Sequence, residues 1–281
     1  MGRLSKLLDI MPTAIMSRGV GVLADIHFPT PIQQRINTSF ARLARMNMEE
    51  SEEPVEAFSC LSDLFTRKLK DGSRVIETGD VISPVDGKLK FSGKVTEGTL
   101  IEAKKQVYSA RQLVGTDDPE LTSWLDDAWA FTIYLPPSSY HRIHAPASGH
   151  ISHISYAPGR LLPVNRIGYF LTDDLLPANE RLTSFITTDD GHRCALVKVG
   201  ATCVGKISLT FDSFSANSTL LRNPFLKALE PSHAVNRGDQ IACFDLGSTV
   251  VLFVENNGFS PCPRLKPNMQ IKMGVALGSW H

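Results

Sequence analysis

Three short segments of the chain carry polar groups that could do chemistry, in apolar and turn-rich surroundings. They are residues 83–87 (SPVDG), 140–146 (YHRIHAP) and 246–249 (LGST). Together they supply one carboxylate, two imidazoles and one hydroxyl, from Asp86, His141, His144 and Ser248. In a nucleophilic relay, a carboxylate fixes the tautomer of an imidazole, and the imidazole takes the proton of a serine. This inventory predicts a relay of Asp86, His144 and Ser248.

Each member of the relay also fits an ordinary structural role. An aspartate before a glycine, as Asp86 is, is typical of a turn that its own side chain stabilises. A histidine between apolar neighbours, as His144 is, is often buried and hydrogen-bonded in a core. Ser248 follows a glycine and precedes an apolar stretch, which is consistent with a turn before a strand. Taken singly, the residues leave both interpretations open.

The composition restricts the class of protein. The chain has 281 residues, with 29 Lys+Arg and 29 Asp+Glu, so its formal net charge is zero. Because no global positive field exists to hold phosphates, we expect no nucleic-acid partner. The 42% hydrophobic and 21% charged residues exclude a disordered, collagenous or coiled-coil protein. The five cysteines form no C-x-x-C pair, which indicates a reducing, cytosolic location and no zinc site.

Residues 1–48 predict amphipathic helices that precede the rest of the protein. Apolar residues recur at helical spacing between positions 4 and 15, and a second helix follows the prolines at 29 and 31. This second helix carries two separate stripes, one apolar and one basic, formed by Ile32, Ile36 and Phe40 and by Arg35, Arg42 and Arg45. A helix packed on the protein's own core would show such a pattern. So would a helix that binds anionic lipid at a membrane surface.

The remainder of the chain predicts a β-rich domain. The acidic segment 49–57 is typical of a solvated linker, and residues 58–281 form the expected catalytic domain, which begins with a short helix over 58–69. Short β-rich stretches punctuated by turn residues follow at 89–95, 130–135, 149–156, 182–187, 194–199, 206–211, 240–244 and 249–254. Two further helices are expected at 107–114 and 119–129. The predicted class is α+β, a mainly antiparallel two-sheet β-sandwich or barrel-like core preceded by amphipathic helices.

The motifs together resemble those of a known family. The segment LGST at 246–249 is similar to the self-cleavage motif of the pyruvoyl-dependent phosphatidylserine decarboxylases of prokaryotic type, which are made as proenzymes. The segments YHRIH and SPVDG are similar to that family's YHR-x-H and P-x-DG. The blocks NER, VGA and VG, at 179–181, 199–201 and 204–205, also resemble the family and stand in the same order. Several blocks in order are far more specific than any one of them.

This resemblance implies that the chain is its own first substrate. His144, oriented by Asp86, would remove the proton of Ser248, whose Oγ attacks the carbonyl of Gly247 and converts the amide to an ester. Elimination then cuts the chain between Gly247 and Ser248. The expected products are a large subunit, 1–247, and a small subunit, 248–281, which stay associated. Ser248 becomes a covalent pyruvoyl group, the only cofactor expected, with no metal.

The resemblance also implies a carboxy-lyase of phospholipid biosynthesis. The pyruvoyl group would form a Schiff base with the amine of phosphatidylserine, and loss of CO2 would yield phosphatidylethanolamine. His141 is the candidate for headgroup contact and proton donation, with His144 as the alternative donor. The expected partner is phosphatidylserine in an anionic membrane, which the helix with Arg35, Arg42 and Arg45 would contact from the cytoplasmic face as a peripheral protein. A homodimer is left open.

Three other functions stay in competition. A non-catalytic module like the biotinyl and lipoyl domains would explain the strand starts near 83 and 144, but the chain lacks their modifiable M-K-M lysine. A serine hydrolase would use the same three relay residues, but the chain lacks G-x-S-x-G. Both would leave the chain uncut. A pyruvoyl-dependent decarboxylase of a soluble amino acid would be cut and would not need to bind a membrane.

Overall fold

The computed structural model describes residues 21–102, 106–164, 172, 174–202, 206–216, 223–245 and 249–281. The expected first helix lies outside these residues. Leu246, Gly247 and Ser248 of the LGST segment and the block at 204–205 also lie outside them.

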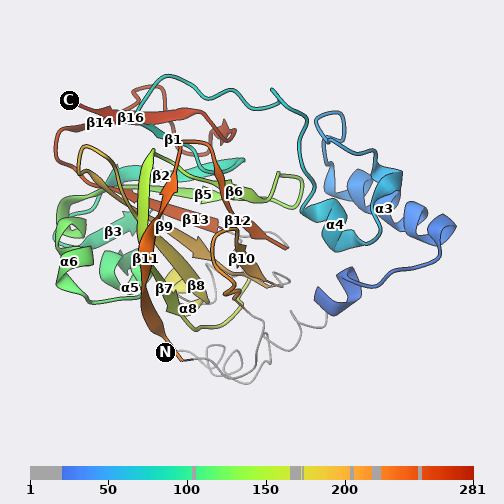
Figure 1. The fold of residues 1–281 in the computed structure, drawn as a ribbon, viewed down its shortest axis with the longest axis horizontal. Coiled ribbons are helices and arrows are strands. Elements are labelled where there is room, and N and C mark those ends of the chain that lie inside the picture. Colours follow the sequence, from blue (N-terminus) through green and yellow to red (C-terminus); the bar gives the residue numbers. More distant parts are fainter. Residues whose placement is uncertain are drawn as a thin grey trace.

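The described part of the chain folds around one large sheet. Its eight strands, in spatial order, are β11 (Phe225–Val235), β7 (Gly149–Ala157), β8 (Arg181–Thr187), β9 (Arg193–Val199), β13 (Thr249–Val254), β5 (Trp129–Tyr134), β2 (Gly87–Lys94) and β15 (Gln270–Ile271). Each neighbouring pair is antiparallel. Figure 1 shows these strands as the centre of the molecule. The sheet is open at both edges and does not close into a barrel.

Three smaller sheets complete the described strands. One consists of β10 (Ile207–Leu209), β12 (Gln240–Phe244) and β6 (Arg142–His144), and another of β1 (Val81–Ile82), β16 (Ala276–Trp280) and β14 (Phe259–Pro261). The third is the hairpin of β3 (Thr99–Glu102) and β4 (Gln106–Ser109). The α+β class and the antiparallel strands expected from the sequence are therefore confirmed.

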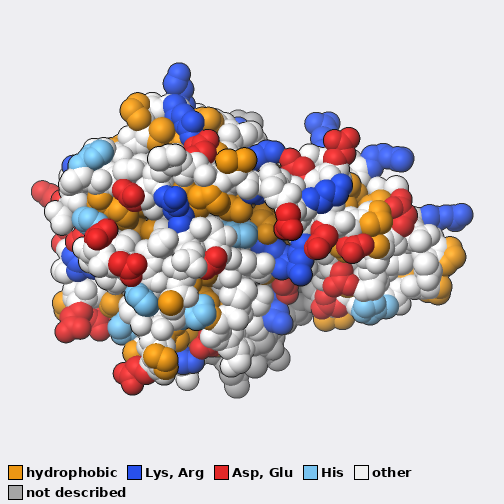
Figure 2. All heavy atoms as spheres, turned by 45° about the horizontal axis from the view of Figure 1, so that its top comes forward, with side chains coloured by type: hydrophobic (Ala, Val, Ile, Leu, Met, Phe, Trp, Pro, Cys, Tyr) orange, Lys and Arg blue, Asp and Glu red, His pale blue; other side chains and the backbone are white. Residues whose placement is uncertain are grey.

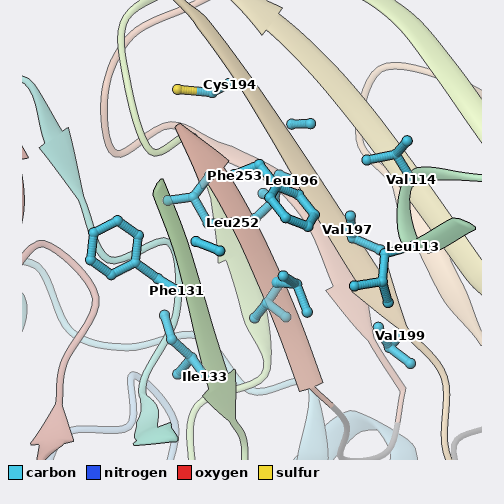
Figure 3. Close-up of a cluster of buried hydrophobic side chains, with 14 of the residues drawn as sticks. Leu113, Val114, Phe131, Ile133, Cys194, Leu196, Val197, Val199, Leu252 and Phe253 are labelled. Carbon is cyan, nitrogen blue, oxygen red and sulfur yellow. The ribbon is translucent and has the colours of Figure 1, made fainter. Parts of the chain in front are cut away.

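Strand β13 lies at the centre of the hydrophobic core. All six of its residues, TVVLFV, are buried, and β5 and β9 pair with it on either side. A strand covered on both faces has no solvent-facing positions, which explains why its sequence is a nearly continuous apolar run. Figure 3 shows side chains of these three strands and of α5 (Ala110–Val114) packed together around β13.

The N-terminal helices lie together at one side of the β-rich body (Figure 1). They are α3 (Thr30–Ala44), the 3-10 turn η1 (Val55–Ala57) and α4 (Leu61–Phe65). A separate apolar cluster holds them together, formed by Ala41, Met46, Leu64 and Phe65. Residues 49–57, expected to be a solvated linker, are attached to the body, because Glu50 pairs with Arg74 and Lys272.

Some elements differ from the sequence-based expectation. Residues 107–114, expected to be a helix, are split between β4 and the short α5, because Ser109 has an extended backbone and its side chain caps α5. The expected helix at 119–129 is one turn, α6 (Pro119–Thr122), followed by the 3-10 helix η2 (Ser123–Asp127). Strand β11 was not expected at all. It is a mostly exposed edge strand, where a proline such as Pro231 is tolerated and apolar alternation is not required.

One lysine is buried inside the large sheet. Lys198 on β9 is fully buried, and its Nζ donates to Ser184 Oγ (2.8 Å) and to the carbonyl of Leu196 (3.2 Å). Among the described residues, no carboxylate forms an ion pair with this amine. Burial lowers the pKa of Lys198 to about 7, because the charged form loses its hydration.

We predict that Lys198 makes stability rise with pH. The unfolded chain keeps the ordinary, higher lysine pKa, so between pH 7 and 10 it binds more protons than the folded chain, and the free energy of unfolding increases as pH rises. Lys198→Met should flatten this rise by about 1 kcal/mol per pH unit. Urea unfolding at pH 7 and pH 9 measures it, in a Ser248→Ala background that keeps the chain in one piece. Exposed Lys266→Met is the control, and equal slopes in all variants would contradict the prediction.

Candidate active site

The segment 83–87 places Asp86 at the start of β2. Gly87 is required there, because a Cβ at this position would lie 2.5 Å from the carbonyl oxygen of Tyr134 on β5. The carboxylate of Asp86 accepts two hydrogen bonds from Arg74, one at 2.8 Å from Nε to Oδ1 and one from Nη2 to Oδ2. Its Oδ1 also accepts from the backbone N–H of Met273 (2.8 Å). Asp86 is therefore held from two sides.

Strand β6 places His144 beside this segment. The backbone N–H of His144 donates to the carbonyl of Pro84 (2.9 Å). Its Nδ1 lies 2.7 Å from the carbonyl oxygen of Gly238, and its Nε2 lies 3.0 Å from the hydroxyl of Tyr140. Because a carbonyl only accepts, Nδ1 carries the proton, and Nε2 accepts from Tyr140. This is the tautomer that a base acting through Nε2 needs, and here Gly238 sets it.

Asp86 and His144 are close but not hydrogen-bonded to each other. Each has the separate partners given above. Burial lowers the pKa of His144, and the carbonyl of Gly238 and the negative charge of Asp86 act in the opposite direction. Asp86 therefore favours the protonated imidazole of His144 through its charge alone, with no hydrogen bond to the ring.

His141 lies in a different environment from His144. It is fully buried, and its ring centroid is 4.0 Å from that of Phe65 on α4. Its Nδ1 lies 2.8 Å from the carbonyl oxygen of Ser139, whereas its Nε2 has no partner among the described residues. Burial lowers the pKa of His141 to about 3, against the hydrogen bond to Ser139. His141 is therefore neutral at physiological pH, with an unpaired acceptor at Nε2.

Strand pairing brings the segment before β13 to the same end of the sheet as Asp86. Tyr134 on β5 pairs with Lys88 on β2 and with Thr249 on β13. Since β2 and β13 are both antiparallel to β5, they run parallel and start at the same end. Two strand spacings, about 10 Å, separate Lys88 from Thr249. Asp86 is two residues before Lys88, and Ser248, outside the described residues, directly precedes Thr249.

Strand β12, which precedes this segment, ends next to the histidines. At the end of β12, the backbone N–H of Phe244 donates to the carbonyl of His141 (3.0 Å). Three residues separate Phe244 from Ser248, and the four steps between their Cα atoms span at most about 14 Å. Asp86, His144 and the start of β13 therefore lie at one end of the large sheet, and Phe244, before the LGST segment, lies beside the histidine segment.

Sequence reasoning missed two residues of this site. Tyr140, whose hydroxyl touches Nε2 of His144, stands in the quoted YHRIH segment but was given no role. Its burial raises the pKa of its hydroxyl to about 12, so it remains a donor at physiological pH. Arg74, which holds Asp86, lies outside every motif, and no spacing in the sequence points to it.

The neighbouring blocks have structural roles. Asn179 is fully buried, and its side-chain amide donates to the carbonyls of Leu162 and Gly200 (3.0 and 2.9 Å). Gly200 follows Val199, which pairs with Thr249. These blocks therefore support the start of β13 from the β9 side. In the described part of the chain, no three His, Cys, Asp or Glu side chains are grouped so as to hold a metal ion.

Helix α3 contacts the rest of the protein mostly through polar residues, together with Ala41. Its buried residues are Gln33, Asn37 and Ala41, and the side-chain amide of Asn37 donates to the carbonyl of Phe58 (2.8 Å). The apolar stripe is only partly covered, since Ile36 and Phe40 are half-buried and Ile32 and Leu43 are 49% and 84% exposed. The three arginines, Arg35, Arg42 and Arg45, are exposed. Figure 2 shows hydrophobic, basic and acidic side chains at this protruding end.

None of the helices in the described ranges is long and apolar enough to cross a membrane.

Comparison with known proteins identifies the family. The sequence profile of the phosphatidylserine decarboxylase family matches residues 61–279. The curated phosphatidylserine decarboxylase proenzymes of Myxococcus xanthus (strain DK1622) and Brevibacillus brevis are each 33% identical over 275 residues, which is 97% of this chain and 96% of the relative. That of Helicobacter pylori (strain 26695) is 32% identical over 267 residues, 95% of this chain and 97% of the relative.

These matches extend over the N-terminal helices as well as the β-rich body. They agree with the resemblance carried by the three motif segments. The chain belongs to the phosphatidylserine decarboxylase family.

Proposed function

We propose that this protein decarboxylates phosphatidylserine to phosphatidylethanolamine with a pyruvoyl group made from its own Ser248. The observation that carries the proposal is that Asp86, His144 and Thr249, one described residue from each motif segment, belong to strands or strand starts at one end of the large sheet. Tyr134 pairs with the strands that follow Asp86 and Ser248, and His144 is hydrogen-bonded to the segment that contains Asp86. The family membership supplies the reaction class.

In the first step, the chain cuts itself. His144 takes the proton of Ser248 through Nε2, and the Oγ of Ser248 attacks the carbonyl carbon of Gly247. The peptide bond becomes an ester. Removal of the Cα proton of Ser248 then expels the carboxylate of Gly247 and leaves dehydroalanine, which takes up water, releases ammonia and becomes the pyruvoyl group.

Two neighbours assist His144 in this step. The negative charge of Asp86 stabilises the imidazolium that forms when His144 takes the proton. The hydroxyl of Tyr140 donates to the same Nε2, so it lies on the path of the transferred proton. The hydrogen bond from Nδ1 to the carbonyl of Gly238 keeps the imidazole in one orientation throughout.

The second step uses the same end of the sheet. The pyruvoyl ketone supplies an electrophilic carbonyl that takes up the substrate amine and accepts electrons as CO2 leaves. Thr249 Oγ1 and His141 Nε2 are buried and have no hydrogen-bond partner in the described part of the chain. Each is therefore available to a polar group of the substrate. We assign headgroup contact to His141, through this acceptor.

The proton that replaces CO2 requires a different residue. His141 is neutral and its Nε2 carries no proton, because burial depresses its pKa to about 3. Nε2 of His144 also carries no proton in the resting site, but the hydroxyl of Tyr140 donates to it and the charge of Asp86 opposes the lowering of its pKa by burial, so we assign proton donation to His144 together with Tyr140.

The intact mass of the purified protein tests self-cleavage. We expect two chains, 1–247 and 248–281, with the smaller one lighter by one ammonia than a peptide that begins with serine. Ser248→Ala should remain a single chain, because it lacks the attacking oxygen. Denaturing mass spectrometry of both proteins makes the measurement. A single chain in both would favour a hydrolase or a non-catalytic module instead.

The variant His141→Asn separates the two steps. Since His141 is outside the self-cleavage relay, we expect the variant to be cut normally. Without the imidazole acceptor, decarboxylation should fall by about 10- to 100-fold, the loss of one hydrogen bond to a charged group. Gel analysis measures cleavage, and release of labelled CO2 from phosphatidylserine measures turnover. Loss of cleavage in a variant that still folds would contradict this division of roles.

We further propose that α3 docks the enzyme on the cytoplasmic face of the cell membrane as a peripheral protein. The exposed Ile32 and Leu43 would enter the acyl boundary, and the exposed arginines would meet anionic headgroups. The burial pattern of α3 supports this, because Ile32 and Leu43 stay exposed while the helix contacts the protein through Gln33, Asn37 and Ala41.

Pelleting with vesicles that contain phosphatidylserine tests this docking. Changing Arg35, Arg42 and Arg45 together to glutamate should abolish pelleting at low salt, because attraction to anionic lipid becomes repulsion. The matched control carries the same charge change at three exposed lysines elsewhere, Lys94, Lys227 and Lys266, and should pellet like the unmodified protein. If the arginine variant pellets equally well, docking by α3 is wrong. No pelleting by any form would favour a soluble amino acid as substrate.

A further inference from the structure

The buried ion pair of Arg74 and Asp86 is the strongest polar contact of the site that the proposed mechanism does not use. The side chain of Arg74 is only 6% exposed. Its Nε and Nη2 grip the two oxygens of Asp86, and its Nη1 donates to the carbonyl of Ser73 (2.7 Å). A guanidinium that binds both carboxylate oxygens fixes the plane of the carboxylate as well as its distance.

A second acidic residue holds Arg74 itself in place. Its Nη2 lies 2.8 Å from Oε2 of Glu50, and the other oxygen of Glu50 accepts from Lys272 (2.6 Å). Burial opposes the charge of Arg74, but Asp86 and Glu50 together raise its pKa. Arg74 is therefore a permanently charged group that is anchored on both sides.

Described residues leave one acceptor position of the Asp86 carboxylate unfilled. An ionised carboxylate has about four acceptor positions. Three are filled, by two nitrogens of Arg74 and by the backbone N–H of Met273. The guanidinium also lies 6.0 Å from the ring centroid of Tyr140, whose hydroxyl touches His144. One side chain thus contacts both neighbours that assist the base.

We propose that Arg74 is the positioning residue of the self-cleavage relay, which it serves by fixing the carboxylate of Asp86 relative to His144. The inference rests on the proposed function, because it assigns Asp86 and His144 to self-cleavage. It adds a residue that touches neither Ser248 nor His144 and acts only through Asp86 and Tyr140. Misplacement of a catalytic group by about 1 Å can cost about 100-fold in rate.

A time course of self-cleavage tests the proposal. The chains are made by cell-free translation, synthesis is stopped, and conversion of the full-length chain is followed on denaturing gels. We expect Arg74→Gln to be cut about 10- to 100-fold more slowly than the unmodified chain. Arg74→Lys should fall in between, because lysine keeps the charge but cannot hold both oxygens.

Rescue distinguishes positioning from a purely structural role. Guanidinium ion, at concentrations far below those that unfold proteins, should accelerate cleavage of Arg74→Ala and leave the unmodified chain unchanged. Arg193→Gln is the matched control, because Arg193 also binds a carboxylate, that of Glu255, at the opposite end of β9 and β13. This control should be cut at the unmodified rate.

The outcomes separate this inference from the function on which it rests. Cleavage of Arg74→Gln at the unmodified rate, while Asp86→Asn stalls, would overturn the role of Arg74 alone. So would slow cleavage that neither lysine nor guanidinium restores, with a melting temperature far below that of Arg193→Gln. If Arg74→Gln does not fold, the rate of Arg74→Lys decides, and an unmodified rate overturns the proposal. If Asp86→Asn and Ser248→Ala are cut normally, the proposed function itself fails.

Discussion

One backbone constraint fixes where β2 and β13 begin in the candidate site. It is the pairing of Tyr134 with one strand on each side. This residue at the end of β5 joins Lys88 of β2 to Thr249 of β13. Such close pairing with β2 tolerates no side chain at Gly87. As a result, two segments more than 150 residues apart start at the same end of one sheet. The short strand β6 pairs with β12, and a hydrogen bond from His144 to the carbonyl of Pro84 holds its histidine beside this end of the sheet.

Local patterns in the sequence predicted the parts of the protein that local forces determine. The apolar run of β13 is visible in a single segment, whereas the roles of Asp86 and His144 were predicted only from several motif segments together. Residues 107–114 were mistaken for one helix because apolar residues near a turn fit both periods, and β11 was missed because an exposed edge strand has no apolar face. Arg74 could not be found, since its buried ion pair exists only once the sheets bring Glu50 and Asp86 together. The depressed pKa of His141 likewise arises from tertiary burial under Phe65.

The N-terminal helices and the site form one continuous structure. Phe65 of α4 covers the ring of His141, and the carbonyl of Thr66 accepts from Nε of Arg142 (2.9 Å). In addition, Arg67 reaches the carbonyl of Ser138 just before the histidine segment. The unit proposed to meet the membrane therefore also forms a wall of the site. This arrangement would give a headgroup a short path from the bilayer surface to the residues that act on it.

The central position of β13 affects how the mature protein keeps its fold. If the chain is cut before Ser248, the strand at the middle of the core belongs to a separate piece of 34 residues. The uncut chain can refold by itself. The large piece of the cut chain must first rebind the 34-residue piece, so its refolding depends on protein concentration. Maturation would thus turn a reversible folding equilibrium into persistence governed by how slowly the two pieces separate. The enzyme would then have to fold as an uncut chain, before cleavage makes it active.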